Sequence, residues 1–164
     1  MKTKFYKKEK KLSVGFAMVE ILVAVAIISA SLLSALLISS KAISVSRQSV
    51  HVAQASFLLE EGAEAVRVMR DNAWTNISGL TPGTTYYPTF SGGTWTLSTN
   101  SSQVGIFTRK VFIGAVNRDA GTADISVNGT NDPGTKLITV NVSWQEGGVT
   151  VSKNLKFYIS NIFP

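Results

Sequence analysis

One stretch of the chain constrains its fold more than any other: residues 16–38, which read FAMVEILVAVAIISASLLSALLI. Glu20 is the single charged side chain in this apolar run. At about 1.5 Å per residue, a helix over the run is long enough to cross the roughly 30 Å hydrocarbon core of a bilayer. The run therefore predicts a membrane-spanning helix near the N-terminus.

The formal net charge of the chain, +6, is concentrated in front of this run. Glu9 alone opposes the basic residues that precede Leu12, which are Lys2, Lys4, Lys7, Lys8, Lys10 and Lys11. This asymmetry predicts a cytoplasmic N-terminus, with the bulk of the chain outside. The net charge of the remaining side chains is close to zero. We therefore expect no nucleic-acid binding by the body of the protein, because phosphate affinity needs clustered cations.

Two other kinds of N-terminal segment remain alternatives. A secretory signal would have a shorter apolar core, of about 7–15 residues, followed by small residues at its cleavage site. Ser29-Ala30-Ser31 imitates such a site, but apolar residues continue beyond it. An uncleaved single-span anchor is the second alternative. The position of Glu20 favours neither.

A lone carboxylate within an apolar span is costly unless it has a partner. Proteolysis after Gly15 would create one, because Phe16 would then carry a free α-amino group at the start of the helix. Glu20 would lie about one turn further on, where opposite charges interact. The two groups would neutralise each other within one chain or between neighbours.

The lysine-rich leader with Gly15, Phe16 and Glu20 resembles the class III signal of type IV prepilins and type II secretion pseudopilins. The resemblance implies cleavage between Gly15 and Phe16 by a prepilin peptidase, N-methylation of Phe16, and a role for Glu20 in filament assembly. It implies three further kinds of partner: other pilin or pseudopilin subunits, an inner-membrane assembly platform and membrane lipid. Ala17 and Met18 depart mildly from the family pattern, and the anchor lacks the Pro or Gly that many major pilins carry.

The helix is predicted to continue through residues 39–72, with an apolar stripe on one side. The stripe consists of Val45, Val52, Leu59 and Val66, thickened by Ala55, Ala63, Val68 and Met69. A coiled-coil stalk is the alternative, but polar residues occupy several of the positions that would form the seam between its helices. The stretch 58–67 also resembles the region after the anchor in minor pilins and pseudopilins.

Residues 73–164 are predicted to form a small antiparallel β head domain. Alternating apolar and polar residues favour strands over 94–99, 107–117, 136–145 and 149–159, with a weaker one over 122–128. The Gly/Thr/Pro-rich residues 74–93 are predicted to be an exposed, variable connection, and 128–129 and 132–134 to be turns. We expect an α+β fold in which the amphipathic half of the helix covers one face of the sheet.

Residues suited to catalysis are sparse. The chain has one histidine, His51, and no cysteine, so classical nucleophile systems and thiolate metal sites lack support. We expect His51 to be an exposed or interfacial polar residue. Asp119, Asp124 and Asp132 could ligate calcium, but their spacing fits no EF-hand, and turn formation is the default. The sequence predicts no enzymatic activity, no cofactor and no metal.

The sequence thus favours a leader over residues 1–15, a membrane-spanning and assembly half of the helix over 16–38, and an amphipathic half over 39–72. The predicted function is that of a structural subunit of a type IV pilus-like filament, a minor pilin or a pseudopilin. It would reside in the cytoplasmic membrane as a single-pass protein and then in a filament at the cell surface. The alternative is a membrane-anchored extracellular binding domain that does not polymerise; an anchored enzyme would need a polar cleft that no residue cluster predicts.

Overall fold

A computed structural model of the chain describes residues 14–162, so most of the predicted leader lies outside the described part. The first element is helix α1, Val14–Asn72, which confirms the long helix predicted from the sequence. At its end the amide of Ala73 still donates to the carbonyl of Met69. The chain divides into two units, which adjoin in sequence between Arg47 and Gln48.

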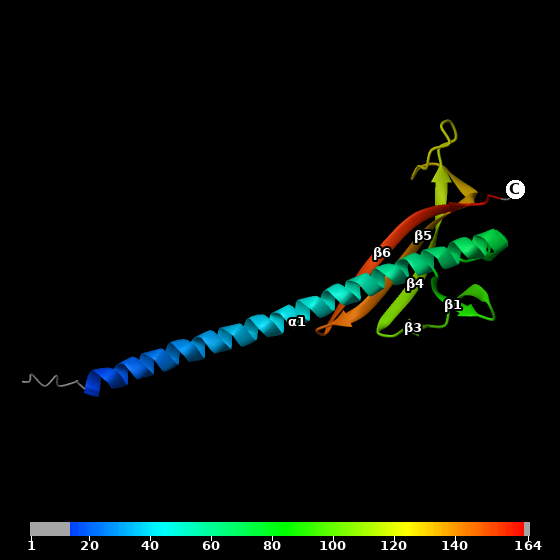
Figure 1. Ribbon diagram of the computed structural model, residues 1–164. Coiled ribbons are helices and arrows are strands. Elements are labelled where there is room, and N and C mark those ends of the chain that lie inside the picture. Colours follow the sequence, from blue (N-terminus) through cyan, green and yellow to red (C-terminus); the bar gives the residue numbers. More distant parts are fainter. Residues whose placement is uncertain (1–13, 163–164) are drawn as a thin grey trace, which may run out of the picture. The chain divides into compact units, whose positions relative to one another are not determined.

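The second unit combines the last part of α1 with a six-stranded antiparallel sheet, the predicted α+β architecture. Its strands follow the order β2-β1-β4-β5-β6, and β3 pairs with β4 away from this path. In Figure 1 the last turns of α1 lie across one face of the sheet. The elements after α1 are α2 (Thr75–Ser78), β1 (Thr85–Ser91), β2 (Thr94–Ser98), β3 (Gln103–Val104), β4 (Phe107–Arg118), β5 (Thr130–Glu146) and β6 (Val149–Ser160).

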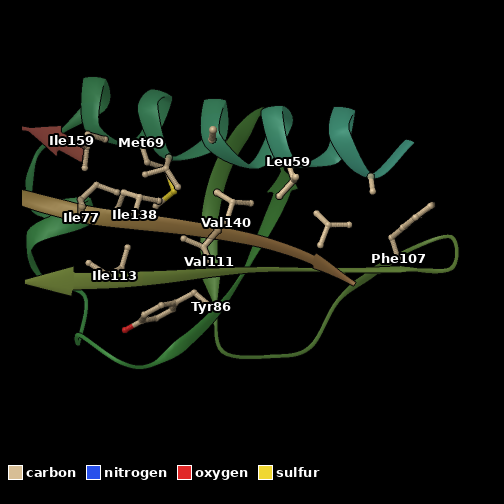
Figure 2. Close-up of a cluster of buried hydrophobic side chains, with 14 of the residues drawn as sticks. Leu59, Met69, Ile77, Tyr86, Phe107, Val111, Ile113, Ile138, Val140 and Ile159 are labelled. Atoms are coloured by element: carbon tan, nitrogen blue, oxygen red, sulfur yellow. The ribbon is translucent and has the colours of Figure 1, made fainter. Parts of the chain in front are cut away.

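The core of this unit lies between α1 and the sheet (Figure 2). Helix residues three and four apart lie on one face, so a stripe from Ala55 to Met69 points toward the strands. Val45 and Val52, which were predicted to belong to this stripe, are exposed. Each strand contributes every second residue to this core, because successive side chains of a strand point to opposite faces of the sheet. The buried members are Ala55, Leu59, Ala63, Val66 and Met69 of α1, Ile77 of α2, and Tyr86, Phe107, Val111, Ile113, Ile138, Val140, Val142, Trp144 and Ile159 of the strands.

The β5–β6 hairpin follows the predicted pattern closely. Glu146 pairs with Val149 across a two-residue turn made by Gly147 and Gly148, whose φ angles are 57° and 83°. A type I′ turn needs positive φ at both central residues, which glycine adopts without strain. The predicted inward row of β5 is buried from Ile138 to Trp144. The hairpin was predictable because both its turn and its alternation are local signals.

The prediction for residues 74–93 was wrong. This segment contains α2 and strand β1, and its Ile77 and Tyr86 are buried in the core. The Tyr, Thr and Phe residues of β1 suit a strand, but Pro88 and the flanking glycines obscured the pattern. Pro88 is accommodated because β1 pairs with β4 only through Thr85 and Tyr86.

Two further expectations need correction at the far end of β4. The predicted strand over 122–128 is reduced to a single bridge between Ile125 and Arg118. The predicted turn over 132–134 lies inside β5, at a bulge where Ala115 pairs with Lys136 but Val116 pairs with Asp132. A bulge shifts the alternation by one residue, which is why Val116 is buried although the regular pattern predicts it outside.

Candidate functional site

The first unit presents an apolar helix surface that the described protein does not cover. Every described residue from Ala17 to Val50 is exposed, including large apolar side chains such as Leu37 at 72%. Among residues 14–162, α1 is the one helix long and apolar enough to cross a membrane, and it lies near the N-terminus. A helix that is apolar on all sides is stable only in lipid or among other helices. This surface is therefore the candidate functional site.

The predicted site residues fall in the first turns of this helix. Gly15 and Phe16 belong to the first turn of α1, and the side chain of Phe16 is not among the described parts of the structure. Glu20 is exposed beside a shallow apolar hollow of about 490 Å³, lined by Val19, Val23, Ala24 and Ile27. The structure thus brings the three residues onto one helix end. The cleavage, methylation and assembly roles stay predictions.

Two serine hydroxyls within the apolar segment are satisfied by the helix itself. Ser31 donates to the carbonyl of Ile27 and Ser34 to that of Ala30, both at 2.8 Å. Such bonds back to the preceding turn remove the cost of a polar group in an apolar environment. The two serines therefore do not oppose burial of this segment in lipid or among helices.

At the start of the second unit, His51 joins the helix to the sheet. Its Nδ1 lies 2.6 Å from Oε2 of Glu146, to which Trp144 Nε1 also donates at 3.0 Å. The imidazole packs edge-on against Phe107, with ring centroids 6.2 Å apart. The expected interfacial role of His51 is confirmed, and its partners come from β4 and β5.

A second link between helix and sheet was not predicted from the sequence. Arg109 Nη1 donates to Oε2 of Glu61 at 2.6 Å, and the guanidinium also lies over the ring of Trp95. Arg109 is buried, whereas Glu61 is about half exposed. The one available sign of this link in the sequence was the position of Arg109 in the inward row of β4. An arginine between Phe107 and Val111 must either bulge outward or pair with a carboxylate.

Two of the aspartates considered as calcium ligands, Asp119 and Asp132, bind neighbouring groups of the protein. Asp119 accepts from the amides of Gly121 and Thr122, and these bonds lower its pKa. Asp132 binds Arg118 at 2.7 Å, and its pKa is lowered by hydrogen bonds from Thr135 and Arg118. Among the residues that the structure describes, no three His, Cys, Asp or Glu side chains are grouped to hold a metal ion.

Comparison with known proteins adds no relative. No family model, no curated protein and no solved structure matches the chain. The resemblance to prepilins therefore depends on the residues themselves, above all Gly15, Phe16 and Glu20.

Proposed function

We propose that this protein is a structural subunit, a minor pilin or pseudopilin, of a type IV pilus-like filament. The observation that carries the proposal is the uncovered apolar part of α1, with one carboxylate, Glu20, near its start and Gly15-Phe16 just before it. An anchor that served only as a tether would gain nothing from a carboxylate within its apolar run. A subunit that docks onto the new, positively charged N-terminus of a neighbour would gain from such a carboxylate.

The proposed sequence of events begins in the cytoplasmic membrane. The lysine-rich leader stays in the cytoplasm, and a prepilin peptidase cuts between Gly15 and Phe16 and methylates the new terminus. Glu20 then meets the amino group of Phe16 of its own or a neighbouring chain. Assembly transfers the apolar helix from lipid into a bundle of like helices, where close packing replaces lipid contacts.

The head is built so that this transfer leaves its core unchanged. All members of its buried cluster lie between Ala55 and Ile159, within the second unit. The head therefore does not depend on apolar contacts from residues 17–47 for its stability. This independence suits a subunit whose first helical half exchanges one apolar environment for another.

Processing is tested by intact-mass analysis of the protein extracted from membranes of its host. The expected species begins at Phe16 and carries one added methyl group. A chain that retains Lys2–Lys11, or one that begins beyond residue 38, would contradict the proposal.

Assembly is tested by replacing Glu20 with glutamine and measuring the share of the protein in sheared filaments against the share in membranes. Because the docking charge is lost, the filament share should fall at least about tenfold, the equivalent of 1.4 kcal/mol. Glu60→Gln is the matched control, because Glu60 is an exposed carboxylate further along the same helix. Equal filament shares for the two variants, or a processed chain that stays in the membrane as a monomer, would favour the alternative of a tethered binding domain.

A further inference from the structure

We propose that an apolar groove on the head receives the apolar helix segment, residues 21–40, of a second copy of this chain. The inference rests on the proposed function, because it names the surface through which one subunit's head would hold another subunit's helix. The groove has a volume of about 520 Å³ and lies between α1 and the β3–β4 turn. Its apolar walls are Phe57 and Leu58 of α1 and Val104, Ile106 and Phe107 of the turn and its strands.

The exposure of these side chains has no explanation within the head. Phe57 is 70% exposed and Ile106 is 52% exposed, although the core of the same unit begins at neighbouring positions of α1. Leaving two large apolar side chains of one groove in water forfeits the gain of burying them. An exposed apolar patch of this kind marks an interaction site.

The turn that carries Ile106 strengthens this reading. Val104 pairs with Phe107 across a two-residue turn, in which Gly105 has a φ of 61°. Glycine at the first central position is what a tight hairpin of this type requires. The second central position imposes no apolar residue, and turn tips are ordinarily polar. Ile106 is therefore not needed by the turn that displays it.

Charge identifies the kind of occupant. Among the described residues that line the groove, none is an Asp, Glu, Lys or Arg. His51, the one titratable group in the lining, is already engaged with Glu146. A charged peptide or a nucleic acid would gain no ion pair here and would lose hydration. The fitting partner is an uncharged apolar element.

The chain itself supplies such an element. Residues 21–40 contain no charged side chain, and all of them are exposed in the described structure. Small residues recur along this segment, namely Ala24, Ala26, Ala30 and Ala35, which allow a helix backbone to approach a surface closely. The same segment on a second copy therefore matches the groove in polarity.

The size of the patch indicates whether the contact could form between two free chains or only within a filament. Three exposed apolar side chains, Phe57, Val104 and Ile106, bury far less than the roughly 1,200–2,000 Å² of a stable pairwise interface. The contact is too weak to pair two free chains. In a filament, each subunit is already held by several neighbours, so a weak contact gains from the high effective concentration.

The test uses disulfide crosslinking of the full chain in cells that contain the assembly machinery. The chain has no cysteine, so each introduced thiol reports one position. One tagged copy carries Ile106→Cys, and a second, differently tagged copy carries a single cysteine at successive positions from 27 to 37. We expect mixed dimers whose yield peaks about every 3.6 positions, the period of a helix with one face against the groove.

Val127→Cys is the matched control for Ile106→Cys, because Val127 is 93% exposed and lies outside the groove. The peak yield with Ile106→Cys should exceed that with Val127→Cys at least about tenfold. Equal yields, or crosslinks confined to a single chain that carries both cysteines, would overturn the groove proposal.

A span-to-span pair separates this proposal from the proposed function. Two copies that each carry Leu32→Cys report packing of the helices alone, because Leu32 is exposed in the apolar segment. Span-to-span dimers without groove-to-span dimers would overturn the groove and leave the filament function standing. The loss of both kinds of dimer would overturn both.

A substitution test complements the crosslinks. Ile106→Asp should lower the filament share of the protein at least about tenfold, because it places a charge opposite an uncharged helix. Val127→Asp should leave that share unchanged. The melting temperature of each purified variant shows that the head is still folded, and an unchanged filament share for a folded Ile106→Asp variant would contradict the proposal.

Discussion

The two halves of helix α1 differ in whether their apolar side chains are exposed or buried. From Ala17 to Arg47 the described side chains are all exposed, whereas from Gln48 onward a stripe from Ala55 to Met69 is buried against the sheet. Backbone hydrogen bonding is the same in both halves, since one helix contains them. The difference lies in how apolar residues are distributed around the helix axis: on all sides from Ala17 to Ile38, and on one side from Ala55 to Met69.

This contrast shows where each half obtains its stability. The second half is stabilised within the chain, through burial against strands β4, β5 and β6. The first half is exposed throughout, and its apolar run is long enough to cross a membrane. Variants placed in one half should therefore change one property of the protein and leave the other unchanged.

The largest expected effect is on the stability of the head. Ile138→Ala should lower the free energy of unfolding by about 2–5 kcal/mol, because it leaves a cavity at a fully buried site. Thermal unfolding of the full chain in detergent, followed by near-UV circular dichroism, measures the change. The same substitution at exposed Ile28 is the control and should leave the melting temperature unchanged. Equal effects at the two sites would break the comparison.

The next effect belongs to the first half alone. Leu33→Lys places a charge in the second half of the apolar run and should weaken membrane insertion by at most about 2.5–3.5 kcal/mol, the cost at the centre of a span. Carbonate extraction of membranes measures the retained fraction, with Leu33→Ala as the control for lost side-chain volume. The melting temperature of the head should not change. A variant that stays fully in the membrane would show that this half is not held by lipid.

A smaller effect is expected at Gly62, where α1 lies close against the sheet. A Cβ at Gly62 would lie 2.8 Å from Val140 Cγ1 and 3.1 Å from Arg109 Cδ. Gly62→Ala should therefore destabilise the head by about 1–2 kcal/mol, since overpacking outweighs the gain in helix propensity. Adding Val140→Ala removes the main clash, so the double variant should lose less than the sum of the two single variants. Additive losses in unfolding experiments would contradict this account.

The smallest effect is a dependence of head stability on pH. The pKa of Asp132 is lowered by its bonds to Thr135 and Arg118, so the carboxylate stabilises the folded head above its ordinary pKa of about 3.9. That contribution is lost as the pH falls through the lowered pKa, because the folded head must then take up the proton that the unfolded chain already holds. Melting temperatures measured between pH 7 and pH 3 should fall less steeply for Asp132→Asn than for the unmodified chain. Parallel curves would show that this aspartate adds no pH dependence.

Several features of the head could not be predicted because they depend on distant partners. The strand within residues 74–93 was missed because Pro88 and the glycines dominate its local pattern. The bulge between Ala115 and Val116 depends on the register of β4 against β5, which neighbouring residues do not encode. The pairing of Arg109 with Glu61 joins residues 48 positions apart, and the local sequence of neither indicates the other.

The sequence by itself determined the long helix, the apolar run with its lone Glu20, and the β5–β6 hairpin with its Gly147-Gly148 turn. These are short-range patterns, in which a period of 3.6 or 2 and the allowed φ angles of glycine specify the structure. Only the tertiary structure decided which apolar residues the head leaves uncovered, Phe57 and Ile106 among them. Burial depends on which surfaces come into contact when the chain folds, and the local sequence pattern does not indicate those contacts.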